Sequence, residues 1–336
     1  METVLLLAHT EADGSLARPA LESLTAAIEL GGELHIGLVG AQVQVAADCL
    51  VGAGSARIFA VTGEAFAQSR YATDAAAAEA ICRASGAPIV VAPTTSRWSR
   101  ALPGVAFRLG GRVDTHATSL TIQNGVPALS RWFYRQRMEG VLTRSQRPWM
   151  VLLDAGCVPA WSGAPGHAVV EAVDVASAET RTTVTGTRSP ETGEQTIRPD
   201  AKLLFVAGAG WTKKQSDGAT HAADAEKLIL DFLRASQASL GGSKSLVDLS
   251  GEGEAVLRFM THMNQIGQTG ATPRHPKGLS TCCHGEEPHA VGWRFVGERR
   301  AVNLDANCGW ARGKADVVYV ADAFEVMRQV NALLAG

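Results

Sequence analysis

At 336 residues the chain is longer than the range in which one hydrophobic core usually keeps growing, so we expect two domains. Hydrophobic residues make up 46% and charged residues 19%, a balance that fits a folded globular protein and excludes wholesale disorder. The 31 Lys and Arg residues are balanced by 33 Asp and Glu residues, so electrostatics give no support to a nucleic-acid partner.

Secretion and membrane insertion find no support in the sequence. The chain starts with an acidic segment, and its first apolar run, Val4 to Ala8, is too short for the core of a signal peptide. No window approaches eighteen apolar residues without charge, so we expect no membrane insertion. The six cysteines are scattered rather than dense: Cys49, Cys82, Cys157, Cys282, Cys283 and Cys308. This usage favours a reducing, cytoplasmic compartment, with buried structural cysteines as the default.

The first part of the chain alternates strand and helix patterns. Strands are predicted at 3–9, 33–40, 55–61 and 87–92, and helices at 19–30, 41–52 and 72–85. This alternation indicates an N-terminal doubly wound parallel sheet with an α/β fold. Ligands of such sheets bind beyond the carboxyl ends of the strands, which points to Thr94–Arg97. The hydroxyl groups there would serve equally well to cap the helix that follows.

In the middle of the chain the residue pattern no longer alternates between strands and helices. Residues 130–143 and 147–153 are predicted to be longer strands near a sheet edge. In the first of them arginines alternate with large apolar side chains (Arg131, Arg135 and Arg137 with Trp132, Tyr134 and Met138). We interpret this segment as a solvated β-ribbon rather than an anion site. Residues 176–200 lack apolar periodicity and are interpreted as a linker. The expected domains are therefore 1–190, which includes the ribbon and linker, and 201–336.

The second domain begins with a predicted strand at 202–207, followed by Gly208-Ala209-Gly210-Trp211 and a helix over about 220–239. A strand, glycine turn and helix in this order can hold a phosphate at the helix N-terminus. The dinucleotide fingerprint is incomplete, because Lys213 stands where the third glycine would fall. A second glycine turn is predicted at 241–245, suited to a pyrophosphate or to a helix cap.

The segment from Gln265 to Gly270 is the strongest candidate for a cofactor-binding loop. Gly267 and Gly270 allow the backbone to turn sharply and to approach a flat ligand closely. Between them Gln268 and Thr269 offer short, directional hydrogen-bonding groups. A polar run rich in turn-forming residues follows as far as His289. These features favour contact with a cofactor ring over an ordinary surface turn.

Taken in order, the motifs of the second domain resemble the alpha subunit of electron transfer flavoproteins. The family's flavin domain carries a turn ending in Val-Asp, then Gln-Val-Gly-Gln-Thr-Gly, Ser-Gly-Ala-Ile-Gln-His, Ile-Asn-Lys-Asp and Ala-Asp-Leu-Phe. This chain has corresponding segments in the same order, at 242–248, 265–270, 284–289, 302–305 and 321–324. The resemblance implies an N-terminal α/β domain and a C-terminal Rossmann-like domain that binds FAD.

The resemblance also implies roles for individual residues. Ser243 would face the FAD pyrophosphate, Ile266 to Thr269 would wrap the isoalloxazine and ribityl region, and His289 would lie at the pyrimidine edge. Asn303 and Asp322 would hold the ribityl-to-adenosine end, with a strand-end turn and a helix N-cap as their alternatives. The full implied cofactor-binding set is Gly210, Ser243, Lys244, Gln265, Ile266, Gly267, Gln268, Thr269, His284, Gly285, Glu286, Glu287, Pro288, His289, Asn303, Asp322 and Ala323.

Two departures from the family pattern affect the flavin. Gly210, with Trp211 beside it, replaces one arginine of the family, and Lys244 replaces another. Guanidinium stacks flat on aromatic surfaces whereas ammonium is a compact, strongly hydrated charge, so we expect an altered flavin potential. The link from Asp248 to Gln265 is also longer than in the family.

A metal site is not predicted. Cys282, Cys283, His284 and Cys308 have the ligand types that zinc prefers. Adjacent cysteines in an extended segment point in opposite directions, however, and the usual ligand spacing is absent.

The leading interpretation is an FAD-bearing electron carrier with no substrate and no catalytic residues of its own. Its implied partners are a beta subunit, in a heterodimer, and a flavin-dependent dehydrogenase as electron donor. Trp132, Phe133, Trp149 and Trp161 suit either that interface or core packing. One alternative is a structural or docking subunit with weakened or lost flavin binding. Another is a nicotinamide-dependent enzyme, which is disfavoured because Asp231, the acid at the expected spacing, falls inside a predicted helix.

Overall fold

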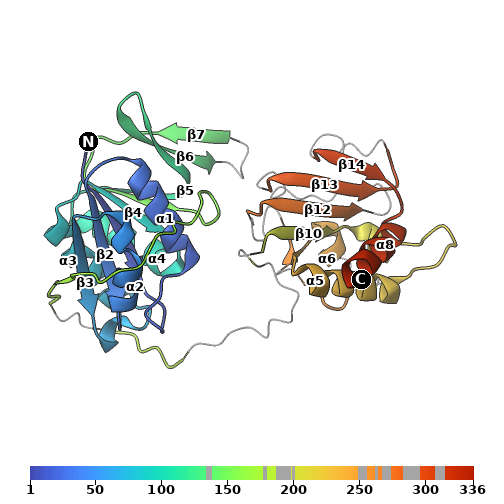
Figure 1. Cartoon of the computed structure of the whole chain (residues 1–336), viewed down its shortest axis with the longest axis horizontal. Coiled ribbons are helices and arrows are strands. Elements are labelled where there is room, and N and C mark those ends of the chain that lie inside the picture. The colour runs from blue at the N-terminus through green and yellow to red at the C-terminus, as the bar shows by residue number, and fades with distance from the viewer. Residues whose placement is uncertain are drawn as a thin grey trace. The chain divides into compact units, whose positions relative to one another are not determined.

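The computed structural model describes residues 1–133, 138–176, 180–186, 198, 201–248, 256–261, 264–266, 274–282, 296–306 and 315–336, without the side chains of Lys244, Asp248 and Cys282. The chain divides into two compact units, Met1–Thr187 and Arg188–Gly336 (Figure 1). Each unit is built around its own sheet. Within the described residues, no helix combines the length and the apolarity needed to cross a bilayer.

The first unit contains a sheet of nine strands in the order β7-β6-β5-β8-β4-β1-β2-β3-β9. The strands are β1 (Val4–His9), β2 (Leu34–Gly40), β3 (Arg57–Thr62), β4 (Ile89–Pro93), β5 (Arg112–Gln123), β6 (Val126–Phe133), β7 (Met138–Leu142), β8 (Trp149–Leu153) and β9 (Glu171–Ala172). Neighbouring strands are parallel except for the antiparallel pairs β5–β6 and β6–β7. The ribbon of β5, β6 and β7 therefore extends one side of an otherwise parallel sheet.

Helices cover both faces of this sheet (Figure 1). They are α1 (Arg18–Glu29), α2 (Gln44–Cys49), α3 (Tyr71–Ser85) and α4 (Ser96–Arg108), with short 3-10 turns η1 (Val51–Ala53) and η2 (Glu64–Phe66). Leu6 packs with Leu24 of α1 on one face, whereas Leu7 packs with Ile81 of α3 on the other. Because both faces are covered, the central strands are apolar at successive positions. The predicted doubly wound α/β fold is confirmed.

The expectation of an edge position for 147–153 is wrong. Strand β8 lies between β5 and β4, and Trp149 is fully buried. The run Trp149-Met150-Val151-Leu152-Leu153 is as continuously apolar as β4, which is the pattern of a strand covered on both faces. The predicted strand at 130–143 is in fact parts of two antiparallel strands, β6 and β7.

The second unit has five parallel strands in the order β11-β10-β12-β13-β14. They are β10 (Leu203–Ala207), β11 (Ser239–Gly242), β12 (Lys277–Cys282), β13 (Glu298–Asn303) and β14 (Val317–Val320). The described helices are α5 (Ala222–Ser236), α6 (Lys244–Asp248) and α8 (Ala323–Ala335), with the 3-10 turn η3 (Ala209–Thr212). Apolar side chains of these helices form one cluster with one face of the sheet. A second cluster, on the other face, includes Leu204, Val206, Ile266 and Ala301.

Two local predictions in this unit need correction. Gly241 and Gly242 are strand residues of β11 rather than a turn. A Cβ at Gly241 would overlap Ile266 Cδ1, and a Cβ at Gly242 would overlap Met260 Cε, so a larger residue at either position would have to displace the side chain packed against it. The glycine turn after β10 leads into η3, and α5 begins only at Ala222, so the N-terminus of α5 does not directly follow this turn.

Candidate functional site

The carboxyl edge of the second sheet gathers most of the described residues of the predicted cofactor site. Gly210 lies in η3 directly after β10, and Ser243 directly follows β11. Asn303 is the last residue of β13, and Asp322 follows β14. All neighbouring strands are parallel, so their carboxyl ends lie at one edge of the sheet. The chain order changes direction at β10, which is where ligands of open α/β sheets bind.

The segment that leads into the predicted cofactor loop is attached to β11. Gln265 forms a parallel bridge with Gly242, and the backbone N–H of Ile266 donates to the carbonyl oxygen of Gly242 at 3.0 Å. The Ile266 side chain is fully buried in the apolar cluster with Leu204 and Val206. Ile266 therefore anchors this segment through core packing, and its side chain is not available to a ligand.

Ser243 lies at the junction between β11 and α6. Its side chain is 1% exposed, and its Oγ accepts from the backbone N–H of Leu246 at 3.2 Å. Its own backbone N–H donates to the carbonyl oxygen of Ala207 at 2.9 Å. The hydroxyl thus acts as the helix cap that the sequence left open as an alternative. Lys244 is the first residue of α6.

Trp211 occupies the space beside Gly210. Its side chain is fully buried, and its indole N–H donates to Thr281 Oγ1 at 2.8 Å. The Thr281 hydroxyl in turn donates to the carbonyl oxygen of Val206 at 3.2 Å. The Trp211 ring lies 4.7 Å from the ring of Phe324, centroid to centroid. One indole therefore joins the turn after β10 to β12 and α8, a structural role that the sequence reading missed.

Asn303 and Asp322 have local hydrogen bonds. Asn303 is 1% exposed, and its Oδ1 accepts from the backbone N–H of Asp305 at 3.4 Å in a strand-end turn. Asp322 Oδ1 accepts from the backbone N–H groups of Phe324 at 2.7 Å and Glu325 at 3.2 Å, and so caps α8. Ala323 is fully buried. The structure thus supports the turn and N-cap interpretations of these side chains.

A pocket of about 450 Å³ opens beside the cap of α8. We call it the Asp322 pocket; it is lined by Gln215, Ser216, Asp217, His221, Asp224, Asp322, Phe324, Glu325 and Arg328. Four of these residues are acidic. Hydrogen bonds from the backbone N–H of Ala219 and from His221, whose Nε2 lies 2.7 Å from Asp217 Oδ2, hold the pKa of Asp217 below its usual value. An acidic lining favours ligands that donate hydrogen bonds, such as sugar hydroxyl groups, and disfavours phosphates.

The central part of the predicted site lies outside the described residues. This applies to Gly267, Gln268, Thr269, His284, Gly285, Glu286, Glu287, Pro288 and His289. It also applies to Cys283 and Cys308. The contacts predicted for the flavin ring itself therefore stay predictions.

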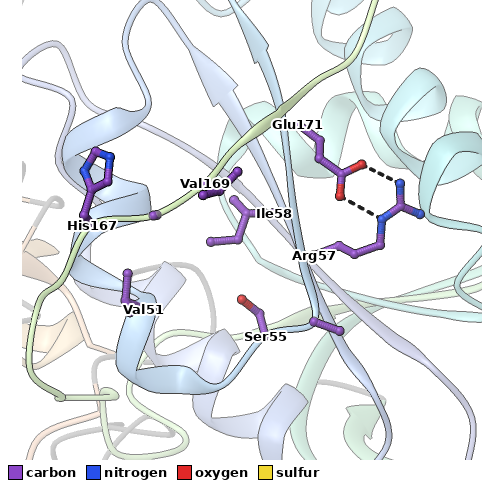
Figure 2. Close-up of a pocket in the computed structure, with 9 residues that line it drawn as sticks. Val51, Ser55, Arg57, Ile58, His167, Val169 and Glu171 are labelled. Atoms are coloured by element: carbon purple, nitrogen blue, oxygen red, sulfur yellow. Dashed lines mark hydrogen bonds and ion pairs between the residues drawn. The ribbon is translucent and has the colours of Figure 1, made fainter.

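In the first unit, the loop after β4 supports a helix cap. Thr95 Oγ1 accepts from the backbone N–H of Trp98 at 3.2 Å, and Arg97 makes an ion pair with Asp74 at 2.7 Å. A second pocket, of about 300 Å³, lies elsewhere in the first unit, between η1, the start of β3 and the segment around β9 (Figure 2). Its main charges, on Arg57 and Glu171, are paired through two hydrogen bonds (Figure 2). None of the residues predicted to bind the cofactor lines this second pocket.

Comparison with known families agrees with this architecture. The family described as electron transfer flavoprotein domain matches residues 4–179, which is just over half of the chain. The chain therefore belongs to the electron transfer flavoprotein family. The match covers the first unit, whereas the motifs that suggested the family from sequence lie mainly in the second. A search of curated proteins finds no match.

Proposed function

We propose that this chain is the alpha subunit of an electron transfer flavoprotein and holds FAD mainly with its second unit. The observation that supports this most strongly is that these residues share the carboxyl edge of the second sheet. Residues that the resemblance assigns to FAD come from four different strand ends, at β10, β11, β13 and β14, and lie at one edge of one sheet. An unrelated sheet would have no reason to place these residue types at successive strand ends in the family order.

The described residues fit FAD in two respects. Ser243 and the backbone after β10 and β11 lie at the switch point, where the pyrophosphate would bind. The acidic Asp322 pocket offers carboxylate oxygens that can accept hydrogen bonds from the ribose hydroxyls. When bound, the flavin supplies the electron-accepting ring, whereas the chain binds it, orients it and sets its electrostatic surroundings.

Trp211 assists this arrangement without touching the flavin in our proposal. Its buried indole fixes the turn that carries Gly210 against Thr281 of β12, so the strand ends on both sides of the switch point are held together. The partners in this proposal are a beta subunit and a flavin-dependent dehydrogenase, and the role is to pass electrons to a downstream acceptor. We place this activity in the cytoplasm.

The proposed beta-subunit surface is the ribbon of β5, β6 and β7. Ile122, Val126, Met138 and Val141 are between 41% and 55% exposed there, although all four are apolar. Strand alternation and register place Ile122 and Met138 on one face of the ribbon and Val126 and Val141 on the other. The proposed partner therefore packs around both faces of the ribbon. Trp149 belongs instead to the core, where its indole N–H donates to Asp114 Oδ2 at 2.9 Å.

A docking subunit with weak or no flavin binding is the second candidate. It is favoured by Gly210 and Trp211, because the residue beside the turn is buried in the core instead of reaching toward a ligand. Under this alternative the second unit keeps its fold for assembly with partners, and the carboxyl edge has lost its ligand.

The visible absorption spectrum of the chain, co-expressed with its genomic neighbours, separates the two candidates. The carrier requires about one FAD released per chain and a visible spectrum that bleaches on reduction. A colourless complex that still assembles would contradict the carrier and support the docking subunit.

A further inference from the structure

The first sheet has its own topological switch point. From β1 the chain proceeds to β2 and β3 on one side, and then returns to place β4 on the other side of β1. The pairing of β1 with β2 continues to His9 and Val39, whereas the pairing of β1 with β4 ends at Leu6 and Val91. The carboxyl ends of β1 and β4 are thus the position in this unit where an open α/β sheet binds a ligand.

Two hydrogen-bond donors at this position have no partner among the described residues. One is the indole N–H of Trp98, whose side chain is fully buried in the first turns of α4. The other is the buried hydroxyl of Thr94, directly after β4. His9 ends β1, and its ring lies 5.9 Å from the ring of Trp98. Buried polar groups are nearly always hydrogen-bonded, so two such donors at one switch point call for an explanation.

The charge around these donors is positive on the α4 side. Arg97 is 5% exposed and donates to Asp74 Oδ1 at 2.8 Å and to the carbonyl oxygen of Phe66 at 2.6 Å. Burial and the charge of Arg97 lower the pKa of His9 to about 4, so this imidazole is neutral near pH 7. Directly after the neighbouring strand β8, the carboxylate of Asp154 lies 3.1 Å from His116 Nδ1. Burial, the larger cause, disfavours charge of either sign, whereas the Arg97 charge, the second cause, favours an anion.

We propose that the carboxyl ends of β1 and β4 bind a small oxyanion, a phosphoryl or carboxylate group, through the indole N–H of Trp98 and the hydroxyl of Thr94. An oxyanion accepts hydrogen bonds from both donors and is attracted by Arg97. The proposal concerns the first unit alone and does not depend on flavin binding in the second.

Trp98 provides a direct readout in the unmodified full chain. With the seven tryptophans labelled with ¹⁵N, Trp98→Phe identifies the indole signal of Trp98 by its loss. Inorganic phosphate and, separately, acetate are then titrated at constant ionic strength. A saturable shift of the Trp98 signal is expected, and the tighter of the two anions identifies the chemical class. A Trp98 signal that stays in place with both anions would overturn the proposal.

Thr94→Val tests the hydroxyl, with Thr121→Val as the matched control on an exposed part of β5. Without the anion, Thr94→Val should unfold at the same or a higher temperature, because it removes a buried hydroxyl that has no partner. Its anion affinity should fall about fivefold, the effect of one lost neutral hydrogen bond. Thr121→Val should change neither quantity. Equal affinity in the parent chain and Thr94→Val would mean an adventitious ion only and would refute the site.

Discussion

At the scale of single residues, Trp211 shows how the fold accommodates Gly210 and Trp211 at a turn where the family has an arginine. The indole fills the space beside Gly210 and satisfies its own N–H with Thr281 Oγ1. Trp211→Phe keeps an aromatic ring against Phe324 but removes the donor and some volume. We expect it to lower the free energy of unfolding by about 1–3 kcal/mol. Urea unfolding followed by circular dichroism measures this.

Trp161→Phe is the control for this change, because Trp161 is only partly buried against the first core cluster. It should lower the free energy of unfolding by less than Trp211→Phe does. Equal losses for the two variants would mean that the Thr281 hydrogen bond contributes nothing to the stability of the second unit.

Asp114 in the first unit is a second residue with a specific energetic role. Burial tends to raise its pKa, but hydrogen bonds from Arg144, at 2.9 Å, and from the Trp149 indole outweigh burial and hold the pKa below its usual value. We expect Asp114→Asn to lower the free energy of unfolding by about 1–3 kcal/mol near pH 7.

The sign of the pH dependence follows from this depressed pKa. The stabilisation is fully present above the pKa of an unfolded aspartate, about 4, and is lost as the pH falls through the lower folded value. The difference between the parent chain and Asp114→Asn should therefore shrink in unfolding experiments below pH 4. A difference that stays constant down to pH 2 would contradict a charge-based role.

At the scale of elements, the β5–β6–β7 ribbon carries the partner interface in our proposal. Val141→Lys places a charge on β7 at a position that is 55% exposed, so the isolated chain should keep its stability. Burying that charge at an interface is costly, so affinity for the beta subunit should fall at least about tenfold. Isothermal titration calorimetry with the purified partner measures the loss.

Val45→Lys is the matched control for the ribbon, because Val45 is 48% exposed but lies on α2. Its affinity for the partner should match that of the parent chain. If Val141→Lys bound the partner as tightly as Val45→Lys, the interface would have to lie elsewhere.

The regular elements show which sequence signals are informative. Continuous apolar runs and amphipathic helices predicted β1, β4, α1 and α3 to within a few residues, because burial on both sheet faces or on one helical face fixes their pattern. Strand β11 is not predictable from its own residues, because Ser239-Leu240-Gly241-Gly242 has no β-branched residue and its two glycines are typical of a turn. Its glycines pack against Ile266 and Met260, which are distant in sequence and adjacent only in the fold.

At the scale of the whole molecule, the sequence predicted the fold class and the family, whereas the cofactor-binding roles of individual residues stay predictions. The resemblance assigned Ser243, Asn303 and Asp322 to the cofactor, but their position at one edge follows only from the parallel pairing of the strands in the structure. Their capping and turn hydrogen bonds could not be separated from ligand contacts, because the same side-chain oxygens serve both purposes. The acidic residues of the Asp322 pocket carry no motif. Asp224 is brought near Asp322 by the packing of α5 against α8, and Asp217 lies in the loop before α5, in contact with His221.

The attachment of Gln265 and Ile266 to β11 also bears on how the chain behaves in solution. Strand β11 is the last named strand on its side of the sheet, and an exposed strand edge is a template for pairing with other molecules. The parallel bridge from Gly242 to Gln265 and the hydrogen bond from Ile266 occupy the backbone of Gly242 at the carboxyl end of this edge. At Gly242, the segment that leads into the predicted flavin loop thereby also leaves less free backbone for pairing with another molecule.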